Sequence, residues 1–153
     1  MIQKRINVNS QNNRVINWVK TIKAGKKILP SDLGSFSMYV KQLGKICMKI
    51  NQEEKVLKYI KTFDVPIKFV YTLNIKKLDY IIKTPTFRSM LSFYTKINKF
   101  RHNFKSPILG NIKKDVFVNI VKIKHEDLNT LNFEDSFSHL KRKSFQMGIE
   151  VLD

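Results

Sequence analysis

Basic and aromatic side chains alternate in the middle of the chain, between Thr86 and Pro107. The basic members of this segment are Arg88, Lys96, Lys99, Arg101, His102 and Lys105. The aromatic members are Phe87, Phe93, Tyr94, Phe100 and Phe104. Lysine and arginine neutralise phosphate groups and release counterions, while aromatic rings and guanidinium planes can stack on unpaired bases. The pattern favours contact with nucleic acid over the structural interpretation, in which the rings belong to the hydrophobic core and the lysines lie on the protein surface.

The distribution of charge points to the same region. The 153-residue chain has a formal net charge of +17, and residues 71–114 carry 10 basic groups and 1 acidic group. Residues 115–153 carry 5 basic and 7 acidic groups, so we expect the anion-facing surface to come from the earlier part of the chain. A chain this basic usually has an anionic partner, most often nucleic acid and less often a membrane surface. The basic run 141–143 is expected only to stabilise the end of a helix.

Residues that usually support catalysis are scattered along the sequence. His102, His125 and His139 lack the paired spacing of a zinc site, and no glycine-rich phosphate loop is present. The single cysteine, Cys47, lies on the apolar stripe of a predicted helix, which indicates core packing and a reducing compartment. We therefore expect no enzyme activity, no metal and no cofactor. No apolar run approaches the roughly 20 residues of a membrane span, and the N-terminus lacks the features of a targeting segment.

Hydrophobic periodicity predicts the elements that position the basic segment. Alternation predicts strands over 14–22, 76–83 and 115–123, the last of them rich in β-branched residues. Apolar residues at steps of three and four predict a helix over 31–51, capped by Ser31 or Asp32. The stretch 53–74 fits both a helix at its beginning and an extended segment towards its end.

The two ends of the chain have different characters. Residues 1–13 are polar and are expected to form a mobile basic arm. A last helix, capped by Asp135 or Ser136, is expected to end at Gly148 and to be followed by a short strand. The remainder, residues 14–153, is expected to form a single domain with an extended loop over about 84–114.

The order helix, glycine, strand at the C-terminal end is a specific feature. The strand sequence is Gly148-Ile149-Glu150-Val151, and Leu140, Arg142 and Phe145 precede it on the helix. This ending resembles that of the small-subunit ribosomal protein S10 family, whose members have Gly-Val-Asp-Val preceded, without gaps, by Leu, Arg and a large aliphatic residue.

Shorter motifs upstream resemble the same family in the same order. The stretch Val65–Phe69 is similar to its Gly-Pro-Ile-Pro-Leu, with Val65 in place of the glycine, and Tyr80–Pro85 is similar to Phe-Thr-Val-Leu-x-Ser-Pro. The stretch Phe93–Lys99 resembles the aromatic-led Arg-Thr-His segment, and residues 117–123 resemble a later strand that contains Val-Asp-Ile.

The resemblance implies a fold and a place of action. The implied fold is α+β, a ferredoxin-like sandwich with a four-stranded sheet, two helices on one face and a long basic hairpin loop. The family lies in the head of the small ribosomal subunit, where its loop threads between ribosomal RNA and neighbouring proteins that include the S3 and S14 families. The insertions and the abundance of lysine resemble a mitochondrial member, so we expect a protein of the mitochondrial matrix, which could be organelle-encoded, or otherwise a cytoplasmic one. No membrane partner is expected.

On these grounds we expect a structural constituent of the small ribosomal subunit. The residues expected to contact ribosomal RNA are Lys76, Lys77, Lys83, Arg88, Lys96, Lys99, Arg101, His102, Lys105, Lys113 and Lys114. One alternative is a viral or plasmid nucleic-acid-binding protein that uses the helical row Lys41, Lys45 and Lys49. A second alternative is a basic accessory subunit of an organellar membrane complex.

Overall fold

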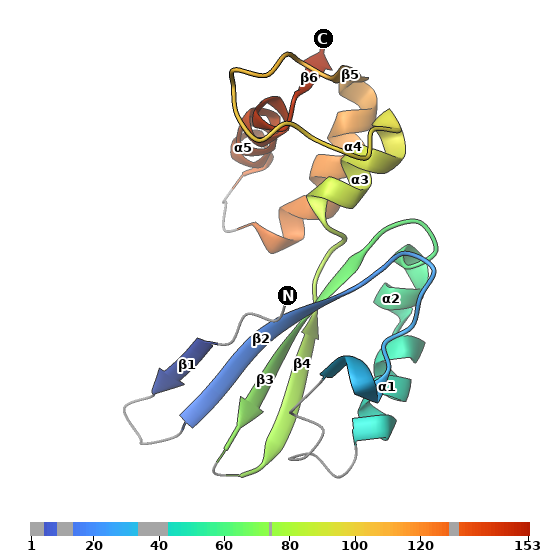
Figure 1. Ribbon diagram of the computed structural model, residues 1–153, viewed down its shortest axis with the longest axis vertical. Coiled ribbons are helices and arrows are strands. Elements are labelled where there is room, and N and C mark those ends of the chain that lie inside the picture. The colour runs from blue at the N-terminus through green and yellow to red at the C-terminus, as the bar shows by residue number, and fades with distance from the viewer. Residues whose placement is uncertain (1–4, 9–13, 34–42, 74, 129–131) are drawn as a thin grey trace. The chain divides into compact units, whose positions relative to one another are not determined.

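The chain divides into two compact units, residues 1–83 and residues 84–153. A computed structural model describes residues 5–8, 14–33, 43–73, 75–128 and 132–153. Each unit combines helices with strands, so the expected α+β class is confirmed (Figure 1). Each unit has its own buried apolar residues, and the single domain over 14–153 that the sequence analysis expected stays a prediction.

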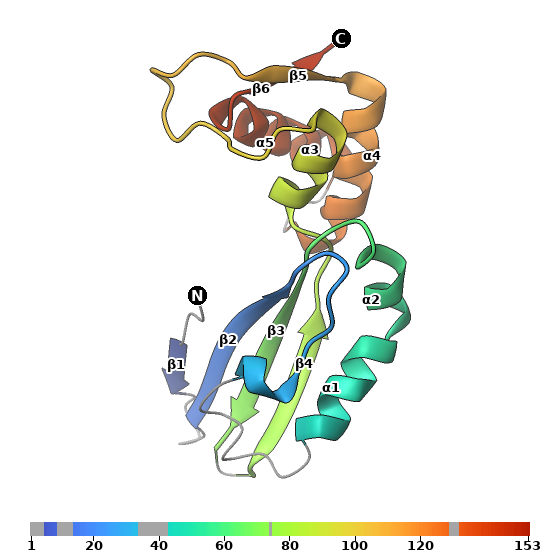
Figure 2. The same cartoon turned by 45° about the vertical axis from the view of Figure 1, so that its right-hand side comes forward.

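The N-terminal unit is built on an antiparallel sheet. Its strands, in spatial order, are β1 (Arg5–Val8), β2 (Arg14–Ile22), β3 (Val65–Thr72) and β4 (Lys77–Ile82). Helices α1 (Leu43–Gln52) and α2 (Glu54–Tyr59) lie on one face of this sheet (Figure 2). The predictions of strands over 14–22 and 76–83 are confirmed. Part of the expected N-terminal arm is strand β1, and its residues 1–4 and 9–13 lie outside the described residues.

The core of this unit follows from the two periodicities of its elements. Alternation along β2 turns Trp18 and Ile22 towards the helices, and the Trp18 ring stacks on Phe69 of β3 with centroids 5.2 Å apart. On α1 the buried residues are Leu43, Cys47 and Ile50, spaced as predicted. Burial raises the pKa of the Cys47 thiol, and the nearby Asp32 carboxylate raises it further. The predicted helix over 31–51 is confirmed from Leu43, while residues 34–42 lie outside the described part.

The ambiguous stretch 53–74 contains both of the structures that its pattern allowed. It begins with α2 and ends with β3. The Tyr80 hydroxyl of β4 donates a hydrogen bond of 2.7 Å to Glu53 Oε1, immediately before α2. This bond ties the helix to the sheet and leaves Tyr80 only partly exposed.

The C-terminal unit contains three helices and a two-stranded parallel sheet. Its elements are α3 (Phe87–Thr95), β5 (Gly110–Lys113), α4 (Lys114–Lys124), the 3-10 turn η2 (His125–Asp127), α5 (Phe133–Gln146) and β6 (Ile149–Leu152). Parallel strands need a crossover, and here α4 and α5 form it between β5 and β6. The Phe117 ring packs edge-on against Phe87 and Phe137, which joins the three helices.

Several expectations for this unit are wrong. Residues 115–123 form helix α4 rather than a strand, because Phe117, Ile120 and Val121 bury one helical face. The expected loop over 84–114 contains α3 and β5, and the final helix starts three to four residues early, with Asn132 as its cap. The last strand is confirmed, but it pairs with β5. Within the described residues, the strands thus form two sheets rather than the one sheet of a ferredoxin-like sandwich.

The turn between α5 and β6 depends on Gly148. Its φ of +92° lies in the left-handed region, as expected for the residue after a helix end. The Gly148 carbonyl accepts hydrogen bonds from the Leu109 and Gly110 amides, and the Met147 carbonyl accepts one from the Arg101 backbone amide. A β-carbon at Gly148 would lie 3.1 Å from Arg101 Cγ and 3.2 Å from Leu109 Cγ. Segment 101–110 therefore wraps around a position at which a side chain would be strained.

We expect Gly148→Ala to destabilise the C-terminal unit. The alanine would be strained at positive φ and would press on the Arg101 and Leu109 side chains, at a cost on the order of 1–3 kcal/mol in the free energy of unfolding. Urea denaturation followed by far-ultraviolet circular dichroism measures the change.

The matched control is Gly44→Ala in α1. A β-carbon at Gly44 meets no heavy atom within 4 Å, and the position is helical. We expect this variant to gain about 0.5–1 kcal/mol from helix propensity. The same sign of change in both variants would contradict the strain assigned to Gly148.

We expect the Tyr80–Glu53 bond to appear in an alkaline titration. Burial raises the pKa of Tyr80 from its ordinary value of 10.0 to about 12, and the hydrogen bond and charge of Glu53 act in the same direction. A raised pKa stabilises the fold fully below about pH 10, and this contribution is lost as the pH rises towards 12. Tyrosinate absorbance should therefore show a late-titrating component that is absent in Tyr80→Phe and shifts back towards 10 in Glu53→Gln. An unchanged titration in Glu53→Gln would refute the coupling.

Candidate nucleic-acid interface

A hollow of about 460 Å³ on the C-terminal unit gathers basic side chains from three helices and a loop. We call it the basic hollow, and its lining residues are Thr86, Phe87, Arg88, Phe100, Arg101, His102, Lys124, Lys143 and Met147. Four of them are permanent cations and none is acidic. Phe87 and Phe100 are 3% and 5% exposed, so their rings form an apolar floor. A concave surface with cations around an apolar floor is suited to bind an anionic ligand.

Two of the cations stand over the aromatic floor. The Arg88 guanidinium lies 5.3 Å from the Phe100 ring centroid, and the Lys143 ammonium lies 5.6 Å from that of Phe87. Within the described residues, neither Arg88 nor Lys143 forms an ion pair. Both side chains are exposed, so their full charge is available to an incoming anion.

Arg101 is held firmly in place. Its guanidinium donates to the carbonyl oxygens of Ser106, at 2.7 Å, and of Phe145, and it stands over the rings of Phe104 and Phe145. The carbonyl partners satisfy donors on the two terminal nitrogens without cancelling the charge, while the buried Nε has no hydrogen-bond partner among the described residues. The side chain is therefore chiefly a structural tie between segment 101–106 and the end of α5, and it adds positive potential to the hollow.

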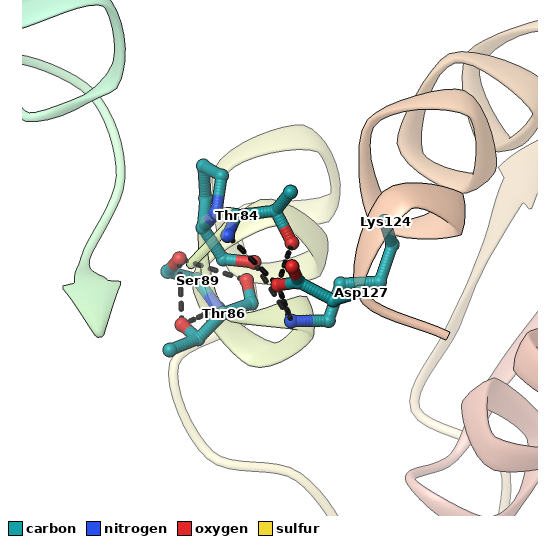
Figure 3. Close-up of polar contacts among 6 residues, drawn as sticks. Thr84, Thr86, Ser89, Lys124 and Asp127 are labelled. Atoms are coloured by element: carbon teal, nitrogen blue, oxygen red, sulfur yellow. Dashed lines mark hydrogen bonds and ion pairs between the residues drawn. The ribbon is translucent and has the colours of Figure 1, made fainter. Parts of the chain in front are cut away.

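Lys124 is positioned by a polar cluster at the start of α3 (Figure 3). Thr84 is fully buried, and both its amide, at 2.7 Å, and its hydroxyl donate to Asp127 Oδ2. The Lys124 ammonium lies 3.8 Å from the same oxygen and donates to the Pro85 carbonyl at 3.3 Å. One carboxylate thus fixes both the entry to α3 and the Lys124 side chain, and it offsets part of the lysine charge.

The α3 cap completes this arrangement. Thr86 is the N-cap of α3, and its hydroxyl oxygen accepts a hydrogen bond from the Ser89 amide at 3.3 Å. The Ser89 hydroxyl donates back to the Thr86 carbonyl at 2.9 Å. The first turn of α3, which carries Phe87 and Arg88, is therefore anchored at its cap and, through Thr84, at η2, which follows α4.

Three of the eleven predicted site residues, Arg88, Arg101 and His102, line the basic hollow. Five others belong to the same unit but lie outside the hollow, and all five are exposed: Lys96, Lys99, Lys105, Lys113 and Lys114. Lys96 ends α3 in the left-handed region, with φ of 59°, while Lys113 and Lys114 lie at the junction of β5 and α4.

The remaining three predicted residues belong to the N-terminal unit. Lys76 lies in the turn before β4 with φ of 50°, and Lys77 pairs with Asp79 at 3.7 Å. The Lys83 amide donates to the Pro66 carbonyl at 3.0 Å, which places it at the end of β4. These lysines are outside the compact unit that carries the hollow.

Sequence reasoning missed Lys124 and Lys143. Lys143 is on α5, where Ser136, Leu140 and Ser144 form the buried stripe, so helical periodicity alone would have placed it beside that stripe. The sequence analysis instead assigned Lys143 only to the stabilisation of the helix end. Lys124 ends a helix that the sequence analysis took for a strand, and no local signal marked it.

The aromatic residues of segment 86–107 divide into two groups. Phe87 and Phe100 are buried, as the core interpretation held, whereas Phe93, Tyr94 and Phe104 are 52%, 40% and 62% exposed. Stacking on an unpaired base is therefore open to the second group only. The Phe104 ring lies beside the half-exposed Phe145 ring, with centroids 6.0 Å apart.

No family model matches this chain. Within the described residues, no group of three or more His, Cys, Asp or Glu is placed to hold a metal ion. A helix of the length and apolar character needed to cross a membrane is likewise not found among them.

We expect Asp127→Ala to loosen the start of α3. The two donors of the buried Thr84 would be left without their acceptor, at a cost on the order of 2–3 kcal/mol. Hydrogen–deuterium exchange should show faster exchange in peptides that cover 84–90. Asp115→Ala, which removes the same charge from the exposed first turn of α4, should leave those peptides unchanged. Equal exchange in the two variants would contradict the anchoring role of Asp127.

Proposed function

We propose that this protein is a non-enzymatic, RNA-binding constituent of the small ribosomal subunit. The basic hollow carries the proposal, because it places Arg88, Arg101, Lys124 and Lys143 around one concavity with no acidic residue in its lining. Phosphate groups are the anions that such a surface most often meets in a chain of this net charge.

In the proposed interaction, cationic side chains contact phosphates and exposed aromatic rings contact bases. Arg88 and Lys143 neutralise phosphates at the mouth of the hollow, since both are exposed and form no ion pair within the described residues. Exposed rings such as Phe104 are available to stack on bases of an unpaired RNA segment. Phosphate contacts fix the register of an RNA without reading its sequence, so the site favours a structural role.

The ribosomal part of the proposal comes from the sequence resemblance. The helix, glycine and strand at residues 133–152 keep the order of the S10 ending, and Gly148 occupies the turn as that order requires. The sandwich of that family is not part of the proposal, because the strands described here form two sheets. Neighbours of the S3 and S14 families and a mitochondrial location belong to the proposal through the resemblance alone.

We expect Arg88→Gln combined with Lys143→Gln to weaken RNA binding. Log K falls as log salt rises, and each phosphate that is no longer neutralised makes this slope less steep by about 0.7 for single strands. The loss of two such contacts should therefore lower the affinity roughly 25-fold at 0.1 M salt. Filter binding to small-subunit ribosomal RNA over a salt series measures both quantities.

The matched control is Lys45→Gln combined with Lys49→Gln. It removes the same charge from two exposed positions of α1, which do not line the hollow. Equal reductions of affinity and slope in the two double variants would contradict a specific role for the basic hollow.

Sedimentation tests the ribosomal assignment. In a sucrose gradient of a cell or organelle lysate, the protein should migrate with the small ribosomal subunit and should be released by ribonuclease. Migration with membranes, insensitive to ribonuclease, would instead favour an accessory subunit of a membrane complex. A preference for duplex DNA over structured RNA at matched salt would favour a DNA-binding protein.

A further inference from the structure

The N-terminal unit carries a second basic concavity that sequence reasoning did not single out. A hollow of about 190 Å³ is lined by Lys20, Lys23, Lys26 and Lys27, together with Thr21, Ile22, Ile28 and Asp32. We call the segment 23–29, which follows β2, the lysine loop. Three of these four lysines, at positions 23, 26 and 27, are exposed.

The backbone of the lysine loop is fixed at several points. The Gly25 amide donates to the Ile60 carbonyl at 2.6 Å, and Gly25 has φ of +77°. The Ala24 amide donates to Asp64 Oδ1 at 2.9 Å. Such a loop presents its lysine side chains from a fixed base, so little backbone entropy is lost when a ligand binds.

The far end of the loop is anchored to α1. Ile28 is 2% exposed, and its amide and carbonyl exchange hydrogen bonds with the Asn51 side chain at 3.0 and 2.9 Å. Leu29, the next residue, donates its amide to Asp32 Oδ2 at 2.9 Å. The chain between Gly25 and Ile28 therefore has little room to rearrange, and it contains Lys26 and Lys27.

The charge of the loop is only partly balanced from within. Asp64 pairs with Lys23 at 3.6 Å, and Asp32 faces the hollow while accepting the Leu29 amide. Against these two carboxylates stand four lysines, so the hollow keeps an excess of positive charge. Its lining contains no aromatic residue, so it can hold phosphate groups but offers no ring on which a base could stack.

We propose that the lysine loop is a second phosphate-binding surface, and that one RNA strand occupies it and the basic hollow at the same time. This inference rests on the proposed function and adds that both compact units contact the same RNA. For an RNA long enough to reach both sites, the second binding event is intramolecular, because the units are joined in one chain, and it raises the overall affinity above that of either site.

The test uses the full chain with Lys26→Gln and Lys27→Gln together. The control is Lys45→Gln with Lys49→Gln, which removes the same charge from exposed positions of α1 in the same unit. The probes are two oligouridylates, one of about 8 nucleotides, close to the footprint of a single site, and one of about 40, long enough for two. Binding is measured by fluorescence anisotropy.

For the long RNA, we expect the affinity of the loop variant to fall tenfold or more, on the order that removal of a linked site produces. For the short RNA, the decrease should stay within about twofold, because the basic hollow still binds it. The control should stay within about twofold of the unmodified protein with both probes, which reflects only long-range charge.

The alternative outcomes separate this inference from the proposed function. If the unmodified protein binds neither RNA, the proposed function fails. If it binds, and the loop variant matches the control while Arg88→Gln with Lys143→Gln still weakens binding, only the lysine loop is refuted. Equal decreases with short and long RNA would refute the simultaneous use of two sites. Weaker binding of the loop variant to phosphatidylserine vesicles, with unchanged RNA binding, would assign the loop to a membrane surface instead.

Discussion

The carbonyl groups of Met147 and Gly148 accept hydrogen bonds from segment 101–110, and this contact holds the C-terminal unit together. It needs a residue without a β-carbon, because the Arg101 stem lies against Gly148. Once Arg101 is seated there, its guanidinium reaches the Phe145 carbonyl and forms part of the basic hollow. The same contact leads directly into β5, whose first residue is Gly110, and so sets its pairing with β6. Fold and candidate site thus share one constraint.

The sequence predicted those elements in which local pattern and tertiary burial agree. Strand β2 alternates and is buried on one side, and the ending α5, Gly148 and β6 follows from capping and periodicity. Helix α4 was mispredicted because its β-branched residues favour a strand locally. Its buried residues Phe117, Ile120 and Val121 have helical spacing, however, and packing decided in favour of that spacing. The pairing of β6 could not be predicted, since its partner β5 is short and lies within a segment expected to be a loop.

For the candidate site, the sequence predicted a basic region but not its geometry. Counting charge by segment placed the binding surface before residue 115, and Arg88, Arg101 and His102 do lie in the hollow. The same count set aside the acidic C-terminal quarter, although Lys124 and Lys143 complete the hollow from there. Several acidic residues of that quarter lie elsewhere, in the first turns of α4 and α5 or at the cap cluster. A segment with a net negative charge can still present a basic surface to a ligand, because residues that are close in sequence lie on different faces of a helix.

The helical state of residues 114–124 has a consequence for self-association. A β-branched apolar segment whose helix buries Phe117, Ile120 and Val121 would, on local opening, expose a sequence suited to cross-β stacking. Packing of the C-terminal unit therefore keeps this aggregation-prone segment buried. Any ligand that binds only the closed unit lowers the open population by mass action. For such a chain, resistance to fibre formation should rise with the fraction of molecules that have the ligand bound.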